Sequence, residues 1–182
     1  MSDGSKMHYI DVFNGDADGI CALIQLRRSN PQSASLVTGV KRDVSLLKQV
    51  EFVNSAHITV LDISFKKNVK DVERLLNQGA IISYIDHHQT GKLLEHEHLH
   101  IDIDLSVDTC TSLIVDQQLQ GQYRAWALTA AFGDNLSDKA MALGLESGLM
   151  HEQLVQLKEF GTYLNYNSYG ISVDDLFYSP PE

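Results

Sequence analysis

The sequence is poor in cysteine, in long apolar runs and in basic residues, and each shortage excludes a class of protein. The spacing of the two cysteines, Cys21 and Cys110, matches neither a zinc knuckle nor a disulfide framework, so we expect reduced thiols that serve as packing residues. No apolar stretch approaches the roughly 18 residues of a membrane span. Residues 1–6 are polar and lack the apolar core of a signal peptide. These absences predict a cytoplasmic protein with no membrane partner.

Basic residues are outnumbered by acidic ones, 14 against 24, which gives the 182-residue chain a formal net charge of -10. General binders of duplex nucleic acid are usually basic, so we expect no duplex partner. A polyanionic substrate would have to be held by a local site, where bound divalent cations could supply the missing positive charge. The 43% hydrophobic and 21% charged fractions are those of an ordinary globular protein, long enough for one domain with a full core.

Five short apolar segments alternate with helical patterns along the first two thirds of the chain. This alternation predicts an α/β fold with a doubly wound, parallel five-stranded sheet in the order 2-1-3-4-5. The segments are residues 9–13, 35–40, 58–61, 80–85 and 100–105. A helix after the third strand is expected to be capped by Ser64 and stopped by Gly79. The rest of the chain is helical, at about 109–119, 123–132, 137–147 and 151–164. We expect one domain over residues 1–168, followed by a tail or a truncated linker over residues 169–182.

Acidic residues and histidines stand where three of the predicted strands end. The run Asn14-Gly15-Asp16-Ala17-Asp18-Gly19 follows the first strand, Asp62 ends the third, and Asp86-His87-His88 ends the fourth. Because the carboxyl ends of parallel strands meet at one edge of the sheet, these side chains should converge. Carboxylates brought together repel one another unless a cation is present. Oxygen ligands with imidazole and without thiolate favour manganese or magnesium.

Three other patterns have alternative interpretations. The acidic turn also resembles the start of an EF-hand calcium loop, but Gln25 stands where that loop needs a glutamate. Lys41 and Arg42 follow the second strand and are either a phosphate clamp or solvated surface. Thr109, Thr111 and Ser112 open a predicted helix whose N-terminus could receive a phosphate, or could simply be capped.

The acidic turn, the strand-final Asp62 and the Asp86-His87-His88 run resemble the first three motifs of the DHH phosphoesterase superfamily. This superfamily includes RecJ-type single-strand exonucleases, nano-RNases, cyclic-dinucleotide phosphodiesterases and family II inorganic pyrophosphatases. Its fourth motif, an aspartate after an apolar helix, is matched by Asp134. The resemblance extends over about residues 8–135 and implies a metal-dependent phosphoesterase.

The resemblance implies two manganese ions, with magnesium as an alternative. Asp16 would bind the first ion and Asp18 the second, while Asp62 would bridge both. His87 and Asp134 would complete the second site. A water molecule between the two ions would attack the phosphorus atom.

The remaining site residues would act on the substrate or on the ligands. His88 would face the phosphate as a hydrogen-bond donor or proton source, and Asp86 would orient the histidines, so that Asp62, His88 and Asp86 form the expected catalytic set. Lys41 and Arg42 would join His88 in binding phosphate.

Two departures from the family pattern bear on function. Many members have a histidine ligand four residues before the first motif aspartate, where this chain has Val12. Asn14 could supply an amide oxygen instead, and the first metal site is then loosely held, filled only with substrate, or empty. The family usually has a further C-terminal domain that grips the substrate. We expect the given residues to be the metal-binding domain alone, either cut from a longer chain or standing by itself.

The predicted substrate is a small nucleotide-type phosphodiester, such as a short oligonucleotide or a cyclic dinucleotide. One alternative is an inorganic pyrophosphatase. Another is a metal-bound nucleotide-binding or regulatory module with little turnover. A homodimer is left open.

Overall fold

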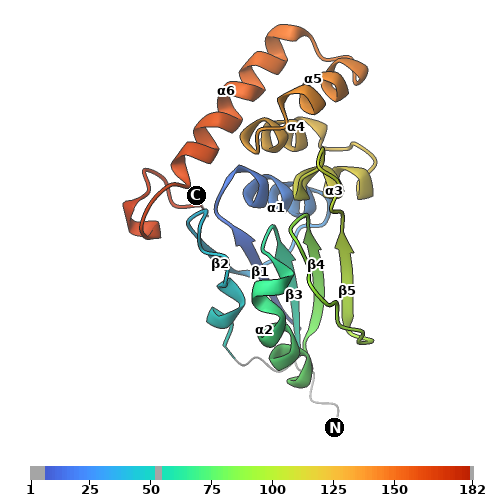
Figure 1. The fold of residues 1–182 in the computed structure, drawn as a ribbon, viewed down its shortest axis with the longest axis vertical. Coiled ribbons are helices and arrows are strands. Elements are labelled where there is room, and N and C mark those ends of the chain that lie inside the picture. Colours follow the sequence, from blue (N-terminus) through green and yellow to red (C-terminus); the bar gives the residue numbers. More distant parts are fainter. Residues whose placement is uncertain (1–6, 52–54, 181–182) are drawn as a thin grey trace.

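The structure is a computed structural model that describes residues 7–51 and 55–180. Within these residues the chain forms a parallel sheet of five strands in the order β2-β1-β3-β4-β5 (Figure 1). The strands are β1 (His8–Asn14), β2 (Ser35–Gly39), β3 (Ala56–Leu61), β4 (Ile81–Asp86) and β5 (Leu99–Ile103). The predicted fold class and strand order are confirmed.

Helices cover both faces of the sheet, as the right-handed crossovers of a doubly wound fold require. Helices α1 (Ala17–Ser29) and α3 (Thr111–Gln118) pack on one face. Helix α2 (Phe65–Asn77) and the short 3-10 helix η1 (Leu46–Gln49) pack on the other. The chain therefore passes from one face to the other between β1 and β3, and the resulting crevice lies at the carboxyl edge of the sheet.

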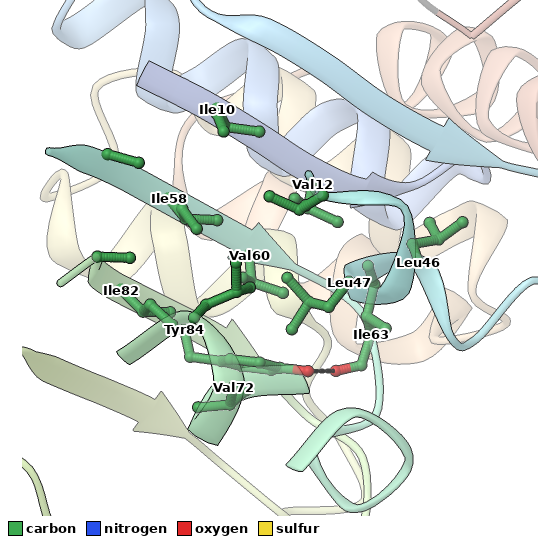
Figure 2. Packing of buried hydrophobic residues seen from close by; sticks show 14 of the residues in the cluster. Ile10, Val12, Leu46, Leu47, Ile58, Val60, Ile63, Val72, Ile82 and Tyr84 are labelled. Atoms are coloured by element: carbon green, nitrogen blue, oxygen red, sulfur yellow. Dashed lines mark hydrogen bonds between the residues drawn. The ribbon is translucent and has the colours of Figure 1, made fainter. Parts of the chain in front are cut away.

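The core under α2 is built from every second residue of the central strands, because successive side chains of a strand point to opposite faces. Figure 2 shows this packing around Ile10, Val12, Ile58, Val60, Ile82 and Tyr84. The Tyr84 hydroxyl donates a hydrogen bond of 2.7 Å to the carbonyl of Ile63, so the one polar atom of this buried ring is satisfied. This bond also ties β4 to the segment just after β3, where Asp62 lies.

The last three helices, α4 (Arg124–Gly133), α5 (Ser137–Glu146) and α6 (His151–Asn167), form a second packed unit beyond the carboxyl edge of the strands (Figure 1). Their apolar side chains share a buried cluster with Cys21 and Cys110, which are both free thiols, as predicted. Across the described residues, no helix is both long enough and apolar enough to cross a membrane.

The predicted tail folds back on α6. The Asn167 side chain donates to the carbonyl of Tyr178 at 2.8 Å and accepts from its N–H at 3.1 Å, and a 3-10 turn, η2 (Val173–Asp175), lies between them. The boundary at residue 168 remains a prediction. The predictions for residues 1–6, and for positions 181–182 of the tail, fall outside the described residues.

The two ends of α2 differ in how well the sequence anticipated them. Gly79 follows the helix with a φ of 88°, a left-handed conformation that glycine adopts without strain, and the predicted stop is confirmed. Ser64 precedes the helix, but its side chain makes no capping bond; the hydroxyl donates to the carbonyl of Gln89 instead. The predicted cap is therefore wrong.

Replacing Gly161 by alanine is expected to lower the free energy of unfolding by about 1–3 kcal/mol, because overpacking forces neighbouring backbone apart. A β-carbon at Gly161 would lie 2.1 Å from the carbonyl oxygen of Thr129, where α6 crosses α4. Urea denaturation would measure the change, with Lys158→Ala on the exposed side of α6 as the control. An unchanged denaturation midpoint for Gly161→Ala would contradict the close helix crossing.

Candidate metal centre

The turn after β1 is organised by the side chains of Asn14 and Asp16. Asp16 is the N-cap of α1, where its Oδ1 accepts hydrogen bonds from the N–H groups of Asp18 (3.0 Å) and Gly19 (3.2 Å). The Asn14 Oδ1 accepts from the N–H of Asp16, and its Nδ2 donates to the carbonyl of Lys41, both at 3.1 Å. Asn14 thus shapes the turn and joins it to the loop after β2; its role as a metal ligand remains a prediction.

The buried carboxylate of Asp18 lies at the N-terminus of α3. Its two oxygens accept from the N–H groups of Thr111 (2.8 Å) and Ser112 (2.7 Å). The proposal that this helix end receives a phosphate is therefore wrong, because Asp18 already occupies the two N–H groups. The same bonds fix the direction of the Asp18 carboxylate, which a metal ligand requires.

Asp62 directly follows β3 in a left-handed backbone conformation, with a φ of 58°. This conformation costs a non-glycine residue roughly 1–2 kcal/mol and is concentrated at functional sites. The N–H of Asp62 donates to the carbonyl of Ile85 (3.1 Å), and the Thr111 hydroxyl donates to its Oδ1 (3.3 Å). Two neighbouring elements thus hold the buried carboxylate in place.

The end of β4 delivers a buried aspartate and two histidines to the same edge. The Asp86 Oδ1 lies 2.6 Å from the Nδ1 of His88, in the orienting arrangement that the family resemblance implies. The other oxygen, Asp86 Oδ2, is buried and has no hydrogen-bond partner among the described residues. The Nε2 of His87 lies 3.4 Å from the nearest oxygen of Asp62, 3.7 Å from that of Asp18 and 3.8 Å from that of Asp134.

Two overlapping groups of side chains have ligand atoms close enough to hold one metal ion. One consists of Asp62, His87 and His88, and the other of Asp18, His87 and Asp134. The structure therefore brings together all four residues expected at the second metal site, from β3, β4 and the ends of α1 and α4. Their hard oxygen and imidazole donors fit manganese or magnesium.

Asp16, the residue expected at the first metal site, is in neither group and contacts Lys41 instead. The Lys41 Nζ lies 2.5 Å from Asp16 Oδ2 and 3.7 Å from Asp134 Oδ1. It also donates to Asn165 Oδ1 of α6 at 3.0 Å. Arg42, the other half of the predicted phosphate clamp, donates to the carbonyl of Gly170 (2.6 Å).

Two solved structures share this arrangement of strands and helices. One is described as the DHH domain of a member of the S1p family of ribosomal proteins; it matches with a TM-score of 0.65 and 14% sequence identity, over 87% of this chain and 47% of that chain. The other, exonuclease RecJ bound to manganese, matches with a TM-score of 0.59 and 16% identity, over 88% of this chain and 53% of that chain. The chain has the DHH-domain fold.

The likeness is one of three-dimensional structure at low sequence identity. No protein-family model and no curated protein matches the sequence. The chain spans about half the length of the two DHH-fold proteins. At this identity the likeness shows the fold alone.

Asp16, Asp18, Asp62 and Asp134 form an acidic cluster, and the surroundings of Asp62 and Asp134 disfavour their negative charge. Burial, and then the neighbouring carboxylates of Asp18 and Asp16, raise the pKa of Asp62 well above its usual value. Burial also raises the pKa of Asp134 to about 6, together with the charge of Asp18. Burial opposes the charge of Lys41, but Asp16 outweighs it and raises the Lys41 pKa to about 12. An added positive charge would therefore stabilise the ionised carboxylates of the acidic cluster.

The metal-free protein is expected to lose stability as the pH rises from about 4 to about 7, by about 1–2 kcal/mol. A carboxyl group whose pKa is raised in the folded protein favours folding while it is protonated. The pKa of Asp134 is about 6 in the folded protein. Its contribution to stability is therefore lost as the pH rises from about 4 to about 6. The hydrogen bond with Asp86 raises the pKa of His88. Protonated His88 therefore stabilises the folded protein, and this stabilisation is also lost as the pH rises and His88 deprotonates.

Melting temperatures in chelator at pH 5 and pH 7 would measure this dependence. Asp134→Asn should flatten it, because the variant carries no titrating group at that position. A metal-free wild type that melts higher at pH 7 than at pH 5 would contradict the predicted sign.

Proposed function

We propose that this protein is a metal-dependent phosphoesterase that hydrolyses small nucleotide-type phosphodiesters, with manganese as the preferred ion. The observation that carries the proposal is the position of His87 Nε2, within 3.4–3.8 Å of carboxylate oxygens from Asp62, Asp18 and Asp134. Three acids and an imidazole come from distant parts of the chain, and two of the acids, Asp18 and Asp62, are buried. Together they form a donor set that suits a divalent cation.

Asp18, Asp62, His87 and Asp134 would hold the ion. A bound divalent cation lowers the pKa of its water and offsets the charge that develops on the phosphate. Asp86 holds the Nδ1 of His88, which leaves the Nε2 of that ring to donate to a phosphate oxygen or to the leaving group. His88 is almost half exposed, with 46% of its side chain accessible, so a substrate can reach it.

The surroundings of the cluster favour a small substrate. A cavity of about 810 Å³ is lined by Lys41, Arg42, residues 168–171 and Asp175. It adjoins the acidic cluster at Lys41, whose ammonium group contacts Asp16. This volume suits a nucleotide or a dinucleotide. The net charge of -10 disfavours a long polyanion.

A metal-bound nucleotide-binding module with little turnover is the second candidate. It is favoured by the engagement of Asp16 with Lys41, because the first ion that the family resemblance implies would need the same carboxylate. In that case the cluster would bind a phosphate without cleaving it.

Incubation with manganese and a panel of phosphate compounds would separate these functions. The panel would contain bis(p-nitrophenyl) phosphate, the dinucleotide pApA, a cyclic dinucleotide and inorganic pyrophosphate. Hydrolysis of the dinucleotides supports the proposal, and hydrolysis of pyrophosphate alone supports a pyrophosphatase. Binding of pApA in calorimetry without turnover supports the binding module.

A further inference from the structure

The ammonium group of Lys41 is held by oxygen atoms from three parts of the chain. It lies 2.5 Å from Asp16 Oδ2, 3.0 Å from Asn165 Oδ1 and 3.7 Å from Asp134 Oδ1. The ammonium donates hydrogen bonds to the Asp16 and Asn165 oxygens, and the Asp134 oxygen at 3.7 Å adds an ion-pair contact. The positive charge of Lys41 therefore lies among oxygen atoms that stabilise it.

The backbone of Lys41 is fixed at both of its polar atoms. Its N–H donates to the carbonyl of Ser168 at 3.0 Å, and its carbonyl accepts from the Asn14 side chain at 3.1 Å. Both partners are buried, since Ser168 is 0% and Asn14 4% exposed. These contacts direct the Lys41 side chain toward the turn that carries Asp16.

While Lys41 is in place, neither carboxylate oxygen of Asp16 is free to bind the first ion of a dinuclear centre. The position where many DHH proteins have a histidine is occupied by Val12, which is fully buried with Val60 and Leu46 in the core under α2 (Figure 2). Asp16 also takes part in neither of the groups that could hold a metal among the described residues. One of its oxygens caps α1 and the other contacts Lys41.

We propose that the ammonium of Lys41 takes the place of the first metal ion, so that the centre binds one divalent cation per chain. This inference rests on the proposed metal site of Asp18, Asp62, His87 and Asp134. A divalent ion on Asp16 would lie beside the ammonium group, and the two positive charges would repel each other. Lys41 thus supplies to Asp16 the counter-charge that a metal supplies in a dinuclear centre.

The number of bound manganese ions tests this inference without an activity measurement. Metal-stripped wild type, Lys41→Ala and Lys41→Gln would be dialysed against manganese to saturation, and the metal per chain counted by elemental analysis. Electron paramagnetic resonance would show whether two bound ions are magnetically coupled. Lys139→Ala is the matched control, because this exposed lysine pairs with Asp108 outside the cluster.

The expected result is one uncoupled ion in wild type and in Lys139→Ala, and a second, coupled ion in both Lys41 variants. Two coupled ions in wild type would overturn the inference while leaving the proposed phosphoesterase intact. A single ion in every folded variant would overturn the role given to Lys41. No bound manganese in folded wild type would overturn the proposed metal site itself, and this inference with it.

Discussion

Asp62→Ala is expected to lower manganese-dependent hydrolysis of a dinucleotide by at least about 10³-fold. The Asp62 Oδ1 lies 3.4 Å from His87 Nε2 and 3.8 Å from His88 Nδ1, so this carboxylate stands between the proposed metal ligands and the proposed proton donor. The carboxylates of Asp18 and Asp16 cannot replace it, because they are directed by their own hydrogen bonds. Steady-state kinetics with pApA would measure the loss.

The fold of Asp62→Ala is expected to survive. The variant removes a carboxyl group whose pKa is raised by burial and then by neighbouring acids, so its removal relieves unfavourable burial and repulsion in the metal-free protein. Asp138→Asn is the control, because it neutralises an exposed acid near the start of α5. Equal turnover in wild type and Asp62→Ala would rule out the proposed site, and equal loss in both variants would point to a general charge effect.

The topology and the centre of the cluster could be predicted because they follow from local patterns. Strictly alternating apolar strands and amphipathic helices permit few arrangements other than a doubly wound parallel sheet. Once the strands are parallel, Asp18, Asp62 and His87 must meet, since each follows or ends a strand at the same edge. Asp134 joins them from the end of α4, where the family motif placed it.

The contacts of Lys41 and Asp18 could not be predicted in the same way. A lysine after a strand has a long, flexible side chain, so its position near the edge does not decide whether it faces substrate or an acid. Its partner Asn165 lies 124 positions further on in α6, and nothing in the pattern of that helix marks it. Likewise, the N–H groups of α3 could have met a phosphate, and only the packing of α3 against α1 brings Asp18 to them.

Removal of the divalent ion is expected to stop turnover and to leave the secondary structure unchanged. The three apolar clusters of the core contain none of the proposed ligands, so the fold does not depend on the ion. Far-ultraviolet circular dichroism before and after chelation would test this. A loss of helical signal in chelator would show instead that the ion is part of the folding energy, as in small zinc domains.

Returning manganese to the stripped protein is expected to raise its melting temperature by about 5–10 °C at a free concentration of about 100 times Kd. An ion that binds only the native state stabilises it by about 2.7 kcal/mol at this saturation, which in a chain of this size corresponds to that rise in melting temperature. Asp62→Ala should lose most of this rise, and Asp138→Asn should keep it. Because the rise reports binding and not catalysis, it separates an inactive metal-binding module from a protein with no metal centre. An unchanged melting temperature with saturating manganese would mean that Asp18, Asp62 and His87 do not share an ion.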